Sequence, residues 1–205
     1  MKRFLLILLA VSSVTTASFA QRFQVGARIG ANLSDYSTAD AKFTEGTFYR
    51  GSVRAGFEAA ILFRLNITRH LNLQTEFEYD RANYDFRYSG PAYAQRNVRL
   101  HADRIEIPLL LGIDAGPVRL FGGASFRAAH SENSSAPSLL RLKFNDSDVA
   151  LTGGAGLKIN KFFIEGRISG YPKKSLTNKI TSKGETLDIK VCHNIKWTLT
   201  AGFFF

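Results

Sequence analysis

Two-residue alternation of apolar and polar side chains constrains this chain more than any other feature of its sequence. From residue 23 to residue 33, every odd position is apolar and every even position is polar or glycine. Because successive side chains of a β-strand point to opposite faces, this period predicts a half-buried strand. The same period returns in seven further segments, residues 52–67, 71–80, 104–114, 118–128, 149–159, 162–169 and 190–205. The sequence therefore predicts an all-β protein with eight antiparallel strands.

The alternation has a few exceptions. Leu62, Phe121 and Phe204 are apolar residues where the pattern expects polar ones, and His193 is a polar residue on an apolar face. Pro108 is the weak point of the fourth segment, since proline cannot donate a hydrogen bond to a β-ladder. These departures are too few to change the strand assignment.

Residues 1–20 are predicted to be a secretory signal peptide. Two basic residues, Lys2 and Arg3, precede an apolar run, and small residues close the segment. The apolar run is shorter than the about 20 residues that a transmembrane helix needs. The mature domain is expected to span residues 21–205, with a formal charge of +8 after Lys2 and Arg3 are subtracted from the +10 of the whole chain. Its single cysteine, Cys192, cannot form an internal disulfide.

The polar face of the predicted strands carries long side chains of both charges, interleaved with glycine. A soluble barrel of the lipocalin type also alternates, with its apolar face around a ligand cavity, so alternation alone does not orient the sheet. A charged face of mixed sign fits a narrow lumen that is filled by mutual ion pairs, while the apolar face is turned to lipid. The candidates for these lumen ion pairs are Arg28, Arg54, Glu58, Arg64, Glu76, Glu78, Arg104, Glu106, Arg119, Arg127, Glu165, Arg167 and Lys196.

The lengths of the links between strands also favour a membrane barrel. The short links lie near residues 68–70, 115–117 and 160–161, and the long links lie near residues 34–51, 81–103, 130–147 and 171–189. Short periplasmic turns and long external loops are typical of outer-membrane barrels, in which a closed sheet pairs every backbone group. The terminal Phe205 resembles the aromatic residue that the barrel-assembly machinery reads. We therefore predict a monomeric, eight-stranded, up-and-down transmembrane β-barrel in the outer membrane.

Four strings of residues carry a resemblance to a known family. They are GARIGANLSD (residues 26–35), RIEIPLLLGI (104–113), DVALTGGAGLKI (148–159) and RISGYPKKSLTN (167–178). Together they resemble the PorT-like outer membrane β-barrel family of Gram-negative bacteria, and the IEIPLLL segment is the most specific of them. The resemblance implies a small outer-membrane barrel, usually without an assigned activity. One member of that family is tied to protein secretion and gliding.

The sequence does not predict an enzyme. Outer-membrane lipid hydrolases of the deacylase type place a histidine and a serine two residues apart, which keeps both groups on one face of a strand. None of the four histidines, His70, His101, His130 and His193, has that spacing. A lipid-modifying enzyme that uses loop or rim residues is the alternative.

No cofactor and no metal ion is expected. Gly153, Gly154 and Gly156 lie in a strand pattern that no helix follows, so they do not fit a phosphate-binding loop. Glycine in a strand is more often a place where neighbouring side chains pack closely or the sheet bends. The oxygen-bearing residues 145–148 lack the spacing of a calcium loop.

The long links carry two further candidate surfaces. Basic residues of the last link are either contacts for lipopolysaccharide phosphates or part of a solvated loop; they are Lys173, Lys174, Lys179 and Lys183. An aromatic group is predicted to extend the third strand into the outer rim or to form a contact patch for a partner protein; it consists of Tyr84, Phe86, Tyr88 and Tyr93. The exported location disfavours nucleic acid as a partner, despite the calculated pI of 9.9.

The expected role is structural or interactive, with the external loops as the working surface. Eight strands leave an interior just wide enough for side chains, which argues against an open pore. A narrow or secretion-associated channel is a further alternative. Because losing one partner of a buried ion pair costs about 3 to 5 kcal/mol, Arg54→Ala or Glu58→Ala is expected to lower the denaturant resistance of the refolded barrel.

Overall fold

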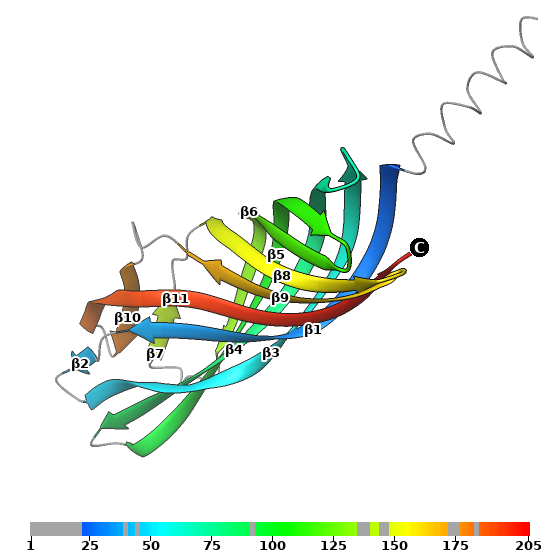
Figure 1. Cartoon of the computed structure of the whole chain (residues 1–205). Coiled ribbons are helices and arrows are strands. Elements are labelled where there is room, and N and C mark those ends of the chain that lie inside the picture. Colours follow the sequence, from blue (N-terminus) through cyan, green and yellow to red (C-terminus); the bar gives the residue numbers. More distant parts are fainter. Residues whose placement is uncertain are drawn as a thin grey trace, which may run out of the picture.

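A computed structural model describes residues 22–38, 41–43, 46–90, 93–134, 140–143, 148–171, 177–182 and 185–205. Almost all of these residues belong to β-strands (Figure 1). In chain order the strands are β1 (Phe23–Thr38), β2 (Ala41–Phe43), β3 (Gly46–Asn66), β4 (Leu71–Gly90), β5 (Tyr93–Ala115), β6 (Val118–Ser134), β7 (Leu140–Lys143), β8 (Val149–Ile159), β9 (Phe162–Gly170), β10 (Thr177–Ser182) and β11 (Glu185–Phe204). Within the described residues, the chain has no helix of the length and apolarity needed to cross a bilayer.

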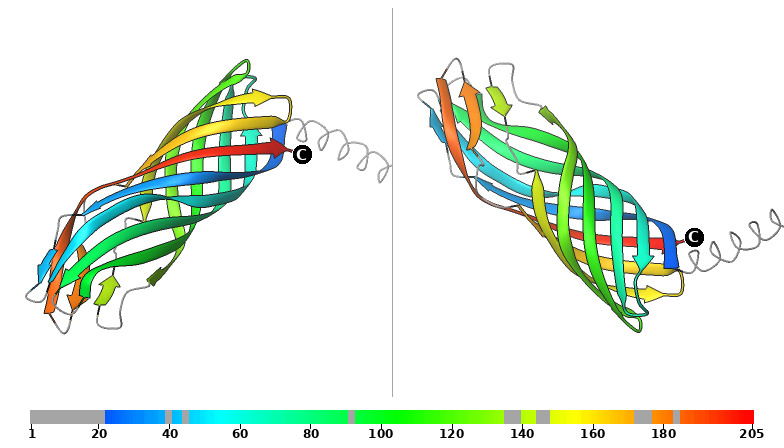
Figure 2. Two further views of the ribbon diagram at one scale, coloured as in Figure 1. Left: turned by 90° about the horizontal axis from the view of Figure 1, so that it is seen from below. Right: turned by 90° about the horizontal axis from the view of Figure 1, so that it is seen from above.

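Eight of these strands close into an antiparallel barrel. Each pairs with its neighbour in the order β1, β3, β4, β5, β6, β8, β9, β11, and β11 returns to pair with β1 from Gly26↔Phe204 to Thr38↔Val191. The short strands β2, β7 and β10 extend the sheet at one end of the barrel, where β10 joins β7 to β11 (Figure 2). Closure pairs the first strand with the last, which removes the open edges that a flat sheet exposes. The predicted eight-stranded antiparallel barrel is confirmed.

The opposite end of the barrel carries tight turns, and the carboxy terminus lies there too (Figure 2). A two-residue turn at Gly116 and Pro117 joins β5 to β6, and another at Asn160 and Lys161 joins β8 to β9. Gly116 has a φ of 64° and Asn160 a φ of 57°. Glycine and asparagine adopt this left-handed region at the lowest steric cost, which is why they fit these turns. The short links therefore lie where the sequence predicts them.

The long links differ from the prediction. The segment 81–103 is not a loop, because β4 continues to Gly90 and β5 begins at Tyr93, with pairing from Arg81↔Asp103 upward. The described outward side chains of this extension are polar, and apolar residues are buried on the inner face instead; they are Ala82, Tyr84 and Ala102. The strand extension predicted from the aromatic group is confirmed for β4, which continues past Tyr84, but the Tyr84 side chain is buried on the inner face instead of lying in the outer rim.

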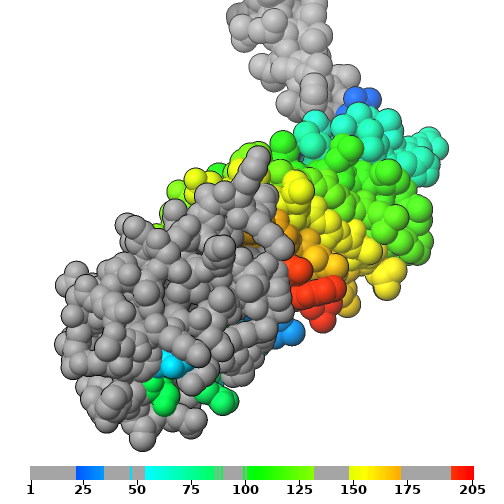
Figure 3. All heavy atoms as spheres, turned by 90° about the vertical axis from the view of Figure 1, so that its left-hand side faces the viewer, coloured from blue at the N-terminus to red at the C-terminus, as the bar shows by residue number. Residues whose placement is uncertain are grey.

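The apolar face of the barrel points outward and the charged face points inward. Ile29, Leu151 and Leu199 are each more than 60 % exposed on the outer wall. A space-filling view shows part of this wall, where β6, β8 and β9 lie side by side (Figure 3). An apolar surface of this size on every side suits a hydrocarbon solvent rather than water.

Substitutions on the outer wall test this orientation. Ile61 lies near the middle of the apolar part of β3, whereas Leu65 lies near its tight-turn end, and both side chains point outward. Ile61→Arg is expected to lower the free energy of unfolding in lipid vesicles by about 2 to 4 kcal/mol, and Leu65→Arg by about 0 to 1 kcal/mol. Urea titration of both refolded variants measures the difference. Equal costs at the two positions would contradict a lipid-facing wall.

Candidate functional site

The interior of the barrel is filled by charged side chains that balance one another. Six cationic and six anionic side chains are buried; they are Arg28, Arg64, Arg104, Arg119, Arg167 and Lys196, with Glu58, Glu76, Glu78, Asp80, Glu106 and Glu165. Among the described residues, every barrel strand except β8 contributes to this set, which we call the lumen network. Its formal charge is zero, since six positive charges meet six negative ones. Burying a charge is tolerated when it is paired, so the network is a fixed filling rather than a loose lining.

Glu76 is the centre of the network. Its carboxylate accepts hydrogen bonds from Arg28 Nη2 at 2.7 Å and Arg28 Nε at 2.9 Å. Arg167 donates from the other side of the lumen, at 2.7 Å from Nη2 and 2.9 Å from Nη1. Arg28 also contacts Glu58 and Glu78, and Arg167 also contacts Glu165. One carboxylate therefore connects β1, β4 and β9 across the barrel.

Lys196 occupies a cage of four carboxylates. Its Nζ lies 2.9 Å from Glu78, 3.5 Å from Glu58, 3.6 Å from Asp80 and 3.7 Å from Glu106. Oxygens of Glu58, Glu78 and Asp80 lie within 4.8 Å of one another, which is a spacing that a metal ion accepts. In this chain the Lys196 ammonium sits among those oxygens and supplies the positive charge.

Tyrosine and serine side chains complete the network toward its upper end, the end that bears β2, β7 and β10. Tyr171 Oη donates to Glu106 at 2.8 Å, and Ser125 Oγ donates to the same carboxylate at 3.1 Å. Arg104 lies 3.7 Å from Asp80 and donates to Tyr84 Oη at 2.6 Å. These neutral groups make hydrogen bonds to carboxylate oxygens and a guanidinium group of the ion-paired residues.

Aromatic rings close the lower half of the lumen. The ring of Phe121 lies between two guanidinium groups, with Arg119 at 4.7 Å and Arg167 at 5.1 Å from its centroid. Phe204 lies under Arg64 at 4.3 Å and packs with Leu62 in a small apolar cluster. Two of the exceptions to the alternation, Phe121 and Phe204, are thus inward-facing rings that pack against cations of the network, an arrangement favoured by cation–π attraction.

The glycines of β8 leave room for this packing. A Cβ on Gly154 would lie 2.6 Å from the ring of Phe121, and one on Gly156 would lie 2.6 Å from Cγ of Glu165. Glycine at these positions lets the long side chains of β6 and β9 reach across the lumen. The glycine-rich string is therefore a packing feature of the barrel.

The structure places the predicted lumen residues as follows. Eleven of the thirteen are buried in the interior, and Arg127 is half-buried there, 5.8 Å from the ring centroid of Tyr171. The prediction is wrong for Arg54. Its side chain is 49 % exposed and points outward, where its Nε lies 2.5 Å from Asp85.

A β-bulge explains the position of Arg54. The ladder between β3 and β4 shifts register between Arg54 and Phe57, so two residues of β3 oppose one residue of β4. One extra residue moves the side chains beyond it to the other face, here as far as the next register shift, between Arg50 and Val53. An exposed ion pair contributes about 0 to 1 kcal/mol, so Arg54→Ala is now expected to change stability little.

The sequence criterion missed two members of the interior. Asp80 follows Glu76 and Glu78 at the same two-residue spacing, so the alternation contained the signal for it. Tyr171 likewise follows Arg167 and Ser169 at two-residue spacing, but it is an aromatic residue just beyond the end of β9, so a search for charged side chains passed over it.

A cavity of about 330 Å³ lies high on the outer wall and is lined by Arg54, Ala55, Asn83, Tyr84, Asp85, Arg99 and His101. A second cavity, of about 560 Å³, lies at the tight-turn end, where Arg22, Arg69 and Lys158 face Asp114. Both lie at the surface of the barrel, at the two ends of the lumen network.

The ring nitrogens of His70 and His101 contact main-chain and amide oxygens. His70 Nδ1 lies 3.0 Å from the carbonyl oxygen of Asp114, and His101 Nδ1 lies 2.6 Å from Oδ1 of Asn83. These are a carbonyl and an amide, whereas a nucleophilic site needs a hydroxyl or thiol beside the base.

Several predicted positions lie outside the residues whose side chains the structure describes. They are His193, Cys192, the oxygen-bearing residues 145–147, the basic residues Lys173, Lys174, Lys179 and Lys183, and three of the aromatic residues, Phe86, Tyr88 and Tyr93. Residues 1–20 also lie outside the described part of the chain. The expectations attached to these positions stay predictions.

Comparisons with known proteins agree with this architecture. No curated protein sequence matches the chain. Among solved structures, the outer membrane protein OprG from Pseudomonas aeruginosa matches with a TM-score of 0.56 at 12 % identity, over 90 % of this chain and 96 % of that one. Ail, the attachment invasion locus protein of Yersinia pestis, is 13 % identical over 90 % of this chain and 99 % of its own, with a TM-score of 0.47. At such identities these matches concern the fold alone.

The family model for the outer membrane protein beta-barrel domain matches residues 18–170. This match covers more than half of the chain and includes β1 to β9. The closed barrel with an apolar outer wall and a charged interior is the architecture expected of such a domain. The chain therefore belongs to the outer membrane protein beta-barrel domain family and is located in the cell outer membrane.

Proposed function

We propose that this protein is a closed barrel that acts as a structural or interaction module, and that its extracellular end is the working surface. The main support for this proposal is the lumen network, in which twelve buried charged side chains of zero net charge fill the interior. A filled interior leaves no continuous water path for solutes. The strands that continue beyond the apolar band on β3, β4 and β5 then provide a rigid platform outside the membrane.

Electrical recordings test the closed lumen. The purified barrel in a planar lipid bilayer is expected to give no steady single-channel current, because Arg28, Glu76 and Arg167 join opposite walls through hydrogen bonds of 2.7 to 2.9 Å. The double variant Arg28→Ala/Glu58→Ala removes one charge of each sign and is the matched comparison, expected to give brief current steps. Long-lived steps from the unaltered protein would support a channel instead.

The proposal includes no catalytic role. Support comes from His70 and His101, whose ring nitrogens contact a carbonyl oxygen and an amide oxygen. Incubation of the refolded barrel with outer-membrane lipids, followed by mass spectrometry of the lipids, is expected to show no change in acyl chains or headgroups. A new lipid species that appears only with the protein would favour the lipid-modifying alternative.

The partner proposed for the working surface is another protein at the cell exterior. Long, paired strands hold their outer surface in a fixed shape, which reduces the entropy lost on binding. A photo-crosslinking residue placed in the segment 171–189 of intact cells, followed by identification of the captured species, tests this. Recovery of lipid alone from that segment would favour the lipopolysaccharide contacts predicted for Lys173, Lys174, Lys179 and Lys183.

Within the outer-membrane family, we propose that the chain is of the PorT-like type. The support is the order and spread of the four resembling strings, of which RIEIPLLLGI forms the lower half of β5. Nothing in these strings selects the secretion role of one member over a general barrel role. Secretion assays on a deletion strain distinguish the two.

A further inference from the structure

The outer wall of β3, β4 and β5 changes from apolar to polar at one level. Among the side chains that the structure describes, Phe57, Tyr79 and Ile105 are the highest large apolar or aromatic ones on that face, and the next long polar side chains are Arg54, Arg81 and Asp103. The register places these residues side by side, since Phe57 pairs with Arg81, Tyr79 with Ile105 and Arg81 with Asp103. The boundary is therefore a line across three neighbouring strands.

This boundary line lies at the level of the outer surface of the membrane. Asp103 lies twelve residues along β5 from Ala115 at the tight-turn end. With a rise of about 3.4 Å per residue and a strand tilt of about 40°, that separation corresponds to roughly 30 Å along the barrel axis. The apolar band of such barrels is about 25 Å tall, so Asp103 stands just above it, in the headgroup layer.

The boundary itself is ordered by hydrogen bonds. Asp103 accepts from Arg81 Nε and from Tyr79 Oη, each at 2.7 Å. The hydrogen bond from Arg81 lowers the pKa of the Asp103 carboxyl, so this group stays ionised. Arg81 remains half-exposed and keeps further donors available above the apolar band.

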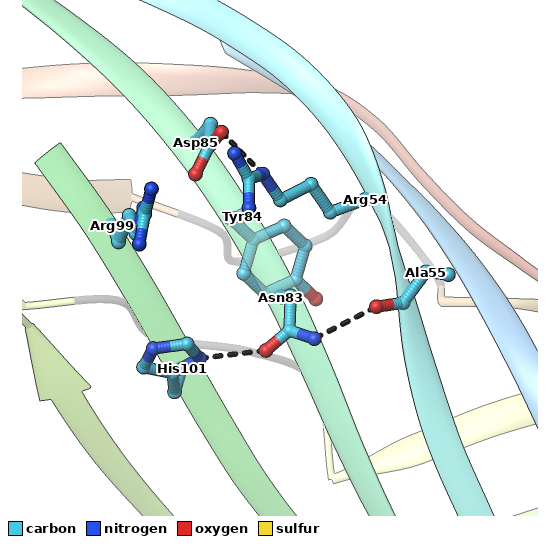
Figure 4. Close-up of a pocket in the computed structure, with 7 residues that line it drawn as sticks. All are labelled: Arg54, Ala55, Asn83, Tyr84, Asp85, Arg99 and His101. Atoms are coloured by element: carbon cyan, nitrogen blue, oxygen red, sulfur yellow. Dashed lines mark hydrogen bonds and ion pairs between the residues drawn. The ribbon is translucent and has the colours of Figure 1, made fainter. Parts of the chain in front are cut away.

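Above this line the wall forms a polar cavity of about 330 Å³ (Figure 4). We call its five polar lining residues the outer-wall cluster; they are Arg54, Asn83, Asp85, Arg99 and His101. Arg54 Nε donates to Asp85 at 2.5 Å, and Asn83 links the neighbouring strands by bonds to Ala55 O at 2.8 Å and His101 at 2.6 Å. The cavity is thus held by contacts between all three strands, and its volume falls at the low end of the roughly 300 to 1,000 Å³ of ligand sites.

Charge in this region favours an anion. Four outward-facing arginines on β3, β4 and β5 stand against two aspartates; they are Arg54, Arg81, Arg87 and Arg99, with Asp85 and Asp103. Asp85 lies opposite Arg99 in the ladder and contacts Arg54 through its carboxylate, so one negative charge stands beside two guanidinium groups. Guanidinium groups match the tetrahedral oxygens of phosphate through paired N–H donors.

We propose that the outer-wall cluster binds the phosphorylated headgroup of lipid A in the outer leaflet. Arg54 and Arg99 hold the phosphate, while Asn83 and His101 offer hydrogen-bonding groups to the sugar beside it. The lipid arrives sideways from the surrounding leaflet, so the site needs no opening into the lumen. The β-bulge that turns Arg54 outward is what brings its guanidinium to this face.

The proposal predicts a specific loss of lipid binding. We expect the double variant Arg54→Gln/Arg99→Gln to weaken binding of bisphosphorylated lipid A by at least about tenfold, as measured by native mass spectrometry of the detergent-solubilised, full-length mature barrel. The reason is the loss of charge-assisted hydrogen bonds to phosphate, of which each guanidinium supplies more than one. The matched control is Arg69→Gln/Lys161→Gln, which removes the same charge at the exposed tight-turn end and is expected to bind as the parent does.

Two further measurements keep the test decisive if the double variant does not fold. The unaltered barrel is expected to bind dephosphorylated lipid A at least about tenfold more weakly than the bisphosphorylated form. Inorganic phosphate at the same concentration is expected not to displace the lipid. Equal binding of the two lipids, equal loss in the control variant, or displacement by inorganic phosphate would each overturn the assignment to a lipid headgroup.

Discussion

Glu76→Gln is expected to destabilise the refolded barrel by about 3 to 5 kcal/mol. The change keeps the shape of the side chain but removes the negative charge that Arg28 and Arg167 share. Both guanidinium groups are buried, so each would face a neutral amide whose NH₂ group cannot accept a hydrogen bond. Removing one partner of a buried ion pair leaves an uncompensated charge, which is the costly case. Urea unfolding in detergent or lipid vesicles measures the shift in midpoint.

An exposed acid provides the control for this substitution. Asp148→Asn removes one negative charge from an exposed position just before β8. Surface substitutions of this kind change stability by about 0.5 kcal/mol or less. If Glu76→Gln and Asp148→Asn shifted the midpoint equally, the central role of Glu76 in the lumen network would be wrong.

Lys196→Met is expected to lower the free energy of unfolding of the barrel by about 3 to 5 kcal/mol, as Glu76→Gln does. It is also expected to create a cation-binding site. Methionine has nearly the length of lysine but no charge, so four carboxylates would surround an apolar chain end. Calcium accepts six to eight oxygen ligands at flexible geometry, and the cage offers oxygens from Glu58, Glu78 and Asp80 within 4.8 Å of one another. Calcium at about 100 times its dissociation constant would restore about 2.7 kcal/mol.

The calcium dependence of thermal unfolding distinguishes calcium binding in the carboxylate cage from a general loss of stability. The unaltered barrel is expected to show no calcium-dependent shift in Tm, because the ammonium of Lys196 already occupies the cage. Lys158→Met is the matched control, since Lys158 lies at the lower mouth, 5.4 Å from the ring centroid of Phe204. A Lys196→Met variant that is as stable as the parent, or that gains no stability from calcium, would refute the cage.

Side-chain alternation, together with the mixed charges of the polar face and the lengths of the links, was enough to predict which face of each strand points inward, but not which charges meet. Glu76 and Arg167 are 91 residues apart in sequence, and their bond depends on closure of the barrel between β1 and β11. Two-residue periodicity describes one strand at a time, so it carries no information about which residues face each other across the lumen. Only the register of the closed sheet supplies that information.

Bulges are the second limit of the sequence prediction. Ala55 and Gly56 fit either face of a sheet, so the extra residue between Arg54 and Phe57 leaves no visible break in the pattern. The prediction therefore kept Arg54 on the charged inner face. The sequence favours a loop for the continuation of β4 and β5 because the apolar residues change face there: Ala82, Tyr84 and Ala102 are buried inside, while the outward positions described beside them are polar.

The cancellation of charge inside the barrel fixes where the excess charge of the protein resides. The whole chain carries a formal charge of +10, and the six cations and six anions of the lumen network contribute nothing to it. The surplus must then be borne by charged residues outside this network, among them the exposed Arg69, Arg81 and Lys161. Mobile ions screen such exposed charges over about 8 Å at physiological ionic strength but reach buried pairs far less. Added salt should consequently detach the barrel from anionic surfaces long before it loosens the fold.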